Sequence, residues 1–279
     1  MAVIRRERYG KLRRIEVSMK LAASNLAWSP QQDSTVLRYM ADHGFTGLEV
    51  APTKIIQNRP YDYPEEAREY SEKIKSEYGL QICSMQSLWY GIPQRIAESA
   101  ETQAMLLEYT KRAIRFADAI ECRNIVFGCP RNRVIKNDGE KHIVEEFLLK
   151  CAEESAKYGI VIAVEANPPI YQTNYLNSTY QVLDLIKRKN HPSLKLNLDC
   201  GTVIENGEML EWLGEEINFI HHVHISEPML ATIKKREIHQ ILADNLKNKY
   251  DYFVSIETQQ QGNLEALFST IDYLRDIFE

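Results

Sequence analysis

The sequence predicts an α/β protein folded as a single (β/α)8 barrel, and three observations support this fold class. Short apolar runs alternate with longer amphipathic segments, and no long linker or low-complexity stretch interrupts them. Such alternation is typical of a parallel sheet, and eight units favour a closed barrel. The length of 279 residues fits one barrel, which typically needs about 250. No GxGxxG turn follows the first strand, which argues against a dinucleotide-binding sheet.

The strands are predicted from short apolar runs bounded by turn residues. They are expected at residues 19–25, 45–50, 80–85, 124–128, 161–165, 194–199, 219–225 and 252–257. The helices are predicted from apolar residues at helical spacing, with glycines such as Gly44 and Gly79 where a helix ends. They are expected at residues 33–43, 64–78, 100–119, 143–158, 179–189, 207–216, 235–246 and 263–278.

The composition is that of an ordinary globular enzyme, with 44% hydrophobic and 26% charged residues. A net charge of −5 lacks the basic footprint of a nucleic-acid binder. The five cysteines are odd in number and contain no CxxC pair, which predicts reduced thiols rather than a disulfide framework. No run approaches the roughly 18 apolar residues that a membrane helix requires. We therefore expect a soluble cytoplasmic protein that binds neither nucleic acid nor membrane.

The chain is expected to divide into a flexible N-terminal extension, residues 1–18, and a barrel domain, residues 19–279. The extension is basic but contains no apolar region followed by a small-residue cleavage site, so it does not match a secretory signal. Met19 begins the first apolar run and marks a natural domain start.

Four of the predicted strands end in a side chain that can bind a metal. These residues are Glu165, Asp199, His224 and Glu257. The carboxyl ends of barrel strands meet at one mouth, where active sites lie. Three carboxylates and an imidazole suit Mn²⁺, Mg²⁺, Co²⁺ or another divalent ion, and Zn²⁺ also stays open. Without a cation, three buried anions would repel one another strongly.

Neighbouring residues compete with this set for the same role. His222 shares the face of His224 because side chains alternate along a strand, but it lies deeper and is expected to be a core histidine. Cys200 follows Asp199, and the same alternation turns it away toward packing.

The chain resembles the xylose isomerase-like barrel superfamily, in particular the sugar phosphate isomerase/epimerase group that includes the ketose 3-epimerases. The resemblance covers nearly the whole chain from Met19. It is carried by the segments 164–168 (VEANP), 197–201 (NLDCG), 222–228 (HVHISEP) and 255–257 (SIE). The order Glu, Asp, His, Glu on strands five to eight is the one that the family uses for its divalent metal.

The resemblance implies a divalent-metal-dependent isomerase or epimerase of a sugar or sugar phosphate. The ion would hold a carbonyl and a hydroxyl oxygen and acidify the neighbouring C–H. Glu165 and Glu257 would then act as base and acid through a metal-bound enediolate. Return of the proton to the opposite face would give epimerisation, and return to the neighbouring carbon would give isomerisation.

The chain departs from the ketose 3-epimerases at two positions. Thr202 and Leu230 stand where those enzymes usually carry a histidine and an arginine, and Gln86 stands where several relatives place a histidine. The absent histidines also count against the endonuclease IV-like branch, which needs three metal ions. A metal-dependent lyase, such as a dehydratase of a keto-inositol, and a non-catalytic sugar-binding barrel remain alternatives, and the nuclease is a weak one.

Several loop and strand residues are candidates to bind the substrate. Arg131 and Arg133 can hold a phosphate or carboxylate, and Glu227 can hold a hydroxyl or cap the following helix. Aromatic faces and amide groups are common in sugar sites. The full set of candidates is Gln86, Trp89, Arg131, Arg133, Asn167, Glu227 and Glu49, with Tyr90 and Asn174 beside them. The expected partner is a small-molecule carbohydrate, and the sequence leaves a homo-oligomer (dimer or tetramer) open.

Overall fold

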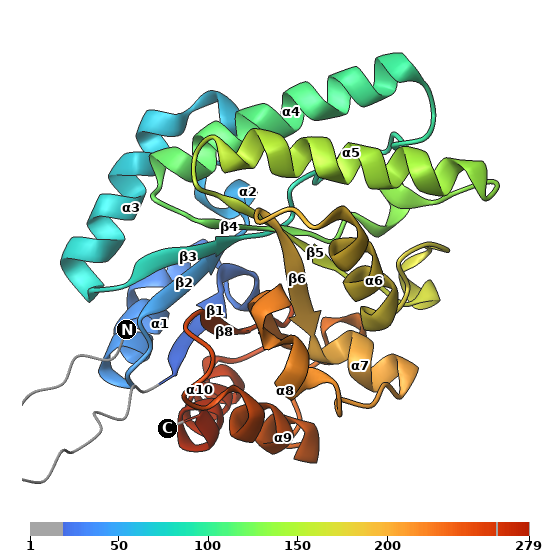
Figure 1. The fold of residues 1–279 in the computed structure, drawn as a ribbon. Helices are drawn as coiled ribbons and strands as arrows, with labels where there is room; N and C mark the ends of the chain where they lie inside the picture. Colours follow the sequence, from blue (N-terminus) through green and yellow to red (C-terminus); the bar gives the residue numbers. More distant parts are fainter. Residues whose placement is uncertain (1–18, 261, 279) are drawn as a thin grey trace, which may run out of the picture.

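Eight parallel strands close into a barrel in the computed structural model of the chain, with each strand paired to its neighbours in sequence order and β8 paired to β1 (Figure 1). The structure describes residues 19–260 and 262–278. The predicted 1–18 extension therefore lies outside the described residues. The strands are β1 (Lys20–Ser24), β2 (Gly47–Val50), β3 (Gln81–Met85), β4 (Asn124–Phe127), β5 (Val161–Glu165), β6 (Leu194–Asp199), β7 (Ile220–Ile225) and β8 (Phe253–Ile256). The predicted (β/α)8 barrel is confirmed.

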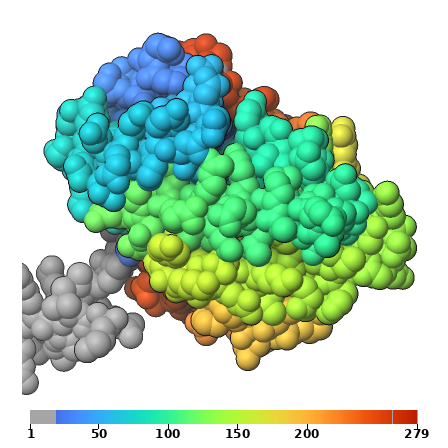
Figure 2. All heavy atoms as spheres, turned by 90° about the horizontal axis from the view of Figure 1, so that it is seen from above, coloured from blue at the N-terminus to red at the C-terminus, as the bar shows by residue number. Residues whose placement is uncertain are grey.

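Helices surround the barrel because each carries one apolar face that packs onto the strands. They are α1 (Asp33–Asp42), α2 (Pro52–Ile55), α3 (Pro64–Tyr78), α4 (Ala100–Ala119), α5 (Gly139–Ala156), α6 (Thr179–Lys189), α7 (Cys200–Asn206), α8 (Leu213–Glu216), α9 (Glu237–Leu246) and α10 (Leu264–Phe278). Helices α4 and α5 pack side by side and cover one flank of the barrel in green and yellow-green (Figure 2). No described helix is long and apolar enough to cross a membrane.

One predicted helix is wrong. Residues 207–216 do not form a helix together, because Gly207 ends α7 with a φ of +61° and a second short helix begins only at Leu213. Helix α7 starts directly after β6 because the carboxylate of Asp199 accepts a hydrogen bond from the backbone N–H of Thr202, which satisfies a free donor at the helix start. The strand end and the helix cap are thus the same residue.

The register of the strands places polar residues at the mouth. Across β6 and β7, Asp199 is level with His224, and across β5 and β6, Glu165 is level with Asn197. The barrel interior below them is buried and contains the polar side chains of Glu49, Ser84 and Ser255. Side chains at the carboxyl ends of β5 to β8 therefore converge on a rigid, close-packed floor.

Candidate active site and metal centre

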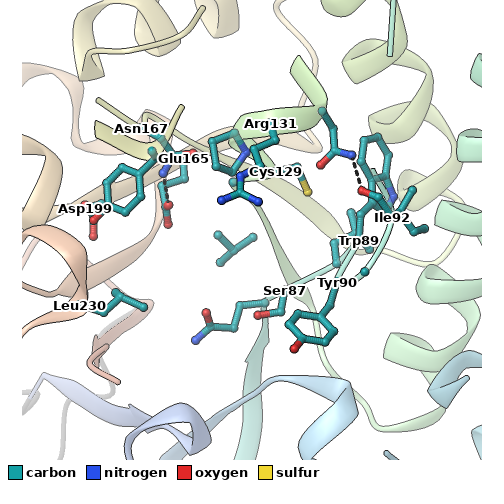
Figure 3. A pocket seen from close by; sticks show the side chains of 18 of the residues that line it. Ser87, Trp89, Tyr90, Ile92, Cys129, Arg131, Glu165, Asn167, Asp199 and Leu230 are labelled. Atoms are coloured by element: carbon teal, nitrogen blue, oxygen red, sulfur yellow. Dashed lines mark hydrogen bonds between the residues drawn. The ribbon is translucent and has the colours of Figure 1, made fainter. Parts of the chain in front are cut away.

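A cavity of about 600 Å³ opens at the carboxyl ends of the strands. Its lining includes Glu165, Asp199 and Glu257, together with the loops that follow β3 and β4. In Figure 3, Glu165 and Asp199 lie on one side of the cavity, and Trp89 and Ile92 lie on the other. This position at the barrel mouth is where barrel enzymes hold their substrates.

Four of the predicted residues form one compact cluster in the cavity floor. Glu165, Asp199, His224 and Glu257 each offer a ligand atom, and these atoms all lie within 4.8 Å of one another. The Nδ1 atom of His224 is 3.2 Å from Oε2 of Glu165 and 3.1 Å from Oε2 of Glu257. The imidazole is fully buried and the carboxylates are nearly so.

Glu165 is held in place at both of its oxygens. Asn167 donates from Nδ2 to Oε1 at 2.7 Å, and Asn197 donates from Nδ2 to Oε2 at 2.7 Å (the first of these is dashed in Figure 3). A Cβ atom added at Gly128 would lie 3.3 Å from Oε1 of Glu165, so the absent side chain leaves room for the carboxylate. Both amide donors lower the mobility of the charged group.

Asp199 is also held at both oxygens. Its Oδ1 accepts the N–H of Thr202 at 2.6 Å, and its Oδ2 accepts the hydroxyl of Ser226. The backbone N–H of Gly201 in turn donates to Oγ of Ser226 at 2.8 Å. A Cβ at Gly201 would lie 3.0 Å from that Oγ atom. A glycine is therefore required for α7 to approach the end of β7 this closely.

His224 contacts carboxylates through both of its ring nitrogens. While Nδ1 faces the cavity cluster, Nε2 lies 3.0 Å from Oε1 of Glu49, which comes from β2 and is fully buried. Glu49 was a candidate to line the sugar pocket, but it is not among the lining residues and lies beneath the cluster. The structure places it behind His224 rather than against a substrate.

The pKa values of the clustered side chains are shifted by burial and by one another. Burial raises the pKa of Glu257 to about 7, because the nearby Glu165 and Asp199 add to the effect while His224 only partly opposes it. Burial and the charge of Glu165 likewise raise the pKa of Asp199 to about 6. Burial lowers the pKa of His224, but the attraction of Glu257 and Glu49 outweighs it and the net pKa lies well above 6.5.

This donor set fits a divalent cation. Carboxylate oxygens and one imidazole nitrogen are ligands that suit Mn²⁺, Mg²⁺, Co²⁺ and Zn²⁺. Three carboxylates gathered in a buried floor are mutually repulsive, and a cation among them would offset that repulsion. Glu165, Asp199, His224 and Glu257 are the residues that would hold it. A second group of possible ligands, Glu49 with His222 and His224, lies deeper in the barrel.

Four of the predicted substrate-binding residues line the cavity. They differ in whether their side chains already have hydrogen-bond partners within the protein. The amide of Asn167 donates to Glu165 and accepts from Arg133. Gln86 donates to Oγ of Ser24 at 2.6 Å, and the indole N–H of Trp89 donates to Thr110. Arg131 is exposed and has no hydrogen-bond or ion-pair partner within the described residues. Tyr90 also lines the cavity and is 74% exposed.

Arg133 does not line the cavity, although the sequence made it a candidate for anion binding. Its guanidinium is fully buried. It donates to the carbonyl oxygens of Gly128, Glu165, Tyr175 and Leu176 and to Oδ1 of Asn167. These bonds tie the loop after β4 to the loop after β5, so no donor is left for a substrate anion.

Glu227 and Asn174 also have structural partners instead of a place in the cavity. Glu227 is buried and forms a two-bond ion pair with Arg236, at 2.7 and 2.5 Å, and it accepts the N–H of Lys234. Its carboxylate therefore holds the loop between β7 and α9. Asn174 exchanges two hydrogen bonds with the backbone of Ile135, which joins two loops.

Further residues in the cavity or beside the cluster were not predicted from the sequence. Tyr171 lines the cavity, and its hydroxyl accepts the N–H of Met229 at 2.8 Å. Asn197 and Ser226 hold the ligand carboxylates. A period-two reading of β6 offered the only signal for Asn197, because it shares the inward face of Asp199. Tyr171 sits in a loop, where no periodicity points to it.

The two sides of the cavity differ in chemistry. The side beside the cluster is lined by Glu165, Asp199 and Glu257, whereas the far side is formed by the loops after β3 and β4, which are mainly apolar but also present Arg131. The apolar residues include Leu88, Trp89, Ile92, Pro93 and Pro130. A ligand that fills the cavity therefore needs one polar end and one apolar or flat end.

The sequence profile of the family described as xylose isomerase-like TIM barrel matches residues 37–275. The chain belongs to this family. No curated protein sequence matches it. Members of the family share the (β/α)8 barrel, so the match agrees with the closed barrel observed here.

Solved structures share the fold at low sequence identity. The 3-keto-D-glucoside 4-epimerase of E. coli superposes with a TM-score of 0.72 at 19% identity, over 92% of this chain and 99% of that one. A family 2 AP endonuclease of Brucella melitensis gives 0.72 at 19%, over 94% and 100%. The D-psicose 3-epimerase of Clostridium cellulolyticum H10 gives 0.70 at 14%, over 94% and 90%.

Proposed function

We propose that the protein is a divalent-metal-dependent isomerase or epimerase that acts on a sugar or sugar-like polyol. The single observation that carries the proposal is the convergence of Glu165, Asp199, His224 and Glu257 in the floor of one cavity. Membership in the xylose isomerase-like family supports it. So does the similarity in fold to two sugar epimerases.

The four clustered residues would hold the ion, which is Mn²⁺, Mg²⁺, Co²⁺ or Zn²⁺. When bound, such an ion acts as a Lewis acid on a substrate carbonyl and lowers the pKa of the neighbouring C–H. Asp199 and His224 serve only to bind in this proposal, because each is fixed by its neighbours on the side away from the cavity. Their rigidity favours a defined ion position.

Glu165 and Glu257 would move the proton. They approach the same ring nitrogen of His224 from β5 and from the residue that follows β8, so both carboxylates would lie close to a substrate bound above the ring. One carboxylate accepts the proton from carbon and the other returns it. Asn167 and Asn197 orient Glu165 for this task.

The substrate would lie between the cluster and the apolar side of the cavity. The cavity of about 600 Å³ is twice the roughly 300 Å³ at which small-molecule sites begin, so it can hold a sugar with a further group attached. Arg131 is available to bind an anionic substituent and Trp89 offers an aromatic wall. The five free cysteines suit a reducing compartment such as the cytoplasm.

The proposed activity is tested by measuring whether hydrogen from the solvent exchanges into carbon positions of candidate sugars. Purified protein is stripped with EDTA, reloaded with Mn²⁺, Mg²⁺, Co²⁺ or Zn²⁺, and incubated in D₂O with a panel of ketoses, ketose phosphates and keto-glycosides. NMR should show deuterium entering at one carbon and an isomer or epimer accumulating, in the reloaded protein and not in the stripped one.

Other outcomes distinguish the alternatives. Loss of a hydroxyl together with exchange would identify a dehydratase, the activity named for a structure of similar fold from Bacillus anthracis. Sugar binding without exchange under any ion would indicate a non-catalytic barrel. Cleavage of abasic DNA by a protein holding several ions per chain would replace the proposal with a nuclease.

A further inference from the structure

Glu49 is a buried carboxylate with a hydrogen-bond donor at each oxygen. It stands on β2, and its side chain crosses the interior of the barrel to β7. Ser84 of β3 donates to Oε1 at 2.8 Å, and Ser255 of β8 donates to Oε2 at 2.8 Å. Nε2 of His224 lies 3.0 Å from Oε1 and Nε2 of His222 lies 3.4 Å from it. All of these groups are fully buried or within 1% of it.

The contacts make Glu49 a hydrogen-bond acceptor at both of its oxygens. Ser84 donates to Oε1, which also faces Nε2 of His224, and Ser255 donates to Oε2. A carboxylate has no proton to give, so the ring nitrogen that faces it must be an N–H. His224 is thereby protonated at Nε2, which leaves Nδ1 for the cavity side.

The second contact at the ring agrees with this assignment. Nδ1 of His224 lies 3.1 Å from the amide nitrogen of Asn197 and 3.2 and 3.1 Å from the carboxylate oxygens of Glu165 and Glu257. With Nε2 occupied by Glu49, Nδ1 is the ring nitrogen that faces the cavity floor.

Glu49 is itself prevented from turning. Oγ of Ser84 accepts the amide of Asn124 at 2.9 Å, so its only proton is committed to Glu49. The chain of bonds runs from β4 through β3 to β2 and then to β7, and Ser255 joins it from β8. Rotation of the His224 ring would break the bond to Glu49 and leave its buried carboxylate without that partner, which costs free energy.

We propose that Glu49 is the positioning residue of the metal centre, holding His224 in the one orientation and tautomer that presents Nδ1 to the ion. This inference rests on the proposed metal-dependent function and adds to it a residue that would touch neither ion nor substrate. Carboxylate partners of this kind behind a ligating histidine typically change metal affinity by 10–100-fold when removed.

The experiment compares Glu49→Gln with Glu145→Gln. Glu145 of α5 is a second buried carboxylate, which accepts hydrogen bonds from Arg188 and Tyr175 and does not line the cavity, so it controls for the loss of a buried charge. Mn²⁺ binding to EDTA-stripped protein is measured by calorimetry, and the visible absorption of bound Co²⁺ reports the ligand geometry. We expect Glu49→Gln to raise the Kd for Mn²⁺ about 10–100-fold and to alter the Co²⁺ spectrum, with Glu145→Gln matching wild type in both.

Each outcome decides the question. An unchanged Kd and Co²⁺ spectrum in Glu49→Gln would overturn the inference while leaving the metal site intact. A wild-type protein that binds no divalent ion would instead overturn the proposed function. Two ions per wild-type chain would make Glu49, with His222, a ligand rather than a positioning residue.

A milder variant covers the case in which Glu49→Gln does not fold. Ser255→Ala removes one donor from Glu49 and leaves its charge. We expect the Kd for Mn²⁺ to rise by less than in Glu49→Gln, between about 2- and 10-fold, because only one hydrogen bond to Glu49 is lost. Wild-type affinity in a folded Ser255→Ala protein would count against the positioning role.

Discussion

Glu49 and Glu257 contact the same imidazole from opposite sides and have opposite properties. Glu49 lies 3.0 Å from Nε2 of His224, and Glu257 lies 3.1 Å from Nδ1. Both carboxylates are almost completely buried. Yet the pKa of Glu49 is held well below its usual range, whereas the pKa of Glu257 rises to about 7.

The difference comes from the neighbours and not from burial. The charges of His224 and His222 lower the pKa of Glu49, which also accepts hydrogen bonds from two serines. Glu257 has no serine or amide donor among the described residues, and Glu165 and Asp199 repel it. A carboxylate surrounded by donors is a fixed part of the scaffold, while one that lacks them is free to exchange protons or bind an ion. In this barrel, a buried carboxylate with several hydrogen-bond donors around it therefore stabilises the structure, whereas one with few donors is available to react or to bind an ion.

The largest effect is expected on turnover from Glu257→Gln and Glu165→Gln. Each removes a group proposed to transfer the proton, and such groups contribute about 10²–10⁴-fold. We expect kcat for deuterium exchange to fall by that factor in each variant, with circular dichroism unchanged. Glu145→Gln is the matched control and should retain full kcat. Wild-type rates in both active-site variants would contradict the proposal that Glu165 and Glu257 transfer the proton.

The fold and the cluster were accessible from the sequence because they follow from periodicity. The carboxyl ends of the strands in a closed parallel barrel lie at one mouth, so Glu165, Asp199 and His224 were expected there. The difference in role between Glu49 and Glu257 could not be predicted from periodicity. It depends on Ser84 and Ser255, which lie on other strands and are defined by the register of the sheet.

Loop residues were the least predictable. Arg131 and Arg133 are two positions apart in one loop, yet the first is exposed beside the cavity and the second is fully buried. The burial of Arg133 is possible only because carbonyl groups from a later loop converge on it, among them those of Tyr175 and Leu176. No local sequence pattern predicts a hydrogen-bond partner more than forty residues away.

The next largest effect concerns metal-induced stability and the shared histidine. Mn²⁺ at 100 times its Kd should stabilise the wild-type protein by about 2.7 kcal/mol, which raises Tm by several degrees. His224→Ala removes the ligand that both carboxylates contact, so we expect most of this shift to vanish. Thermal denaturation with and without Mn²⁺ measures it, and metal analysis of the variant provides a second readout. A full metal complement in His224→Ala would argue against this ligand.

A smaller effect separates the two carboxylates in the metal-free protein. Glu257→Gln relieves repulsion among three clustered carboxylates and should stabilise the protein by on the order of 1 kcal/mol, as removal of active-site strain often does. Glu49→Gln loses bonds to a charged acceptor and should destabilise it by about 1.5–3 kcal/mol. Urea unfolding of EDTA-stripped variants gives both values. Shifts of the same sign would show that donor count does not distinguish the two positions.

The smallest effect is expected at Arg131, which stands at the other extreme from Glu49 because it has no partner within the described residues. A solvated guanidinium contributes little to the fold, so Arg131→Ala should leave Tm unchanged. If Arg131 binds an anionic substituent, KM for a phosphorylated substrate should rise several-fold while KM for the neutral sugar and both kcat values stay constant. Arg131→Lys keeps the charge but loses the planar fork, and we expect it to restore part of the affinity. An equal change in KM for both substrates would assign Arg131 to the shape of the cavity instead of to its charge.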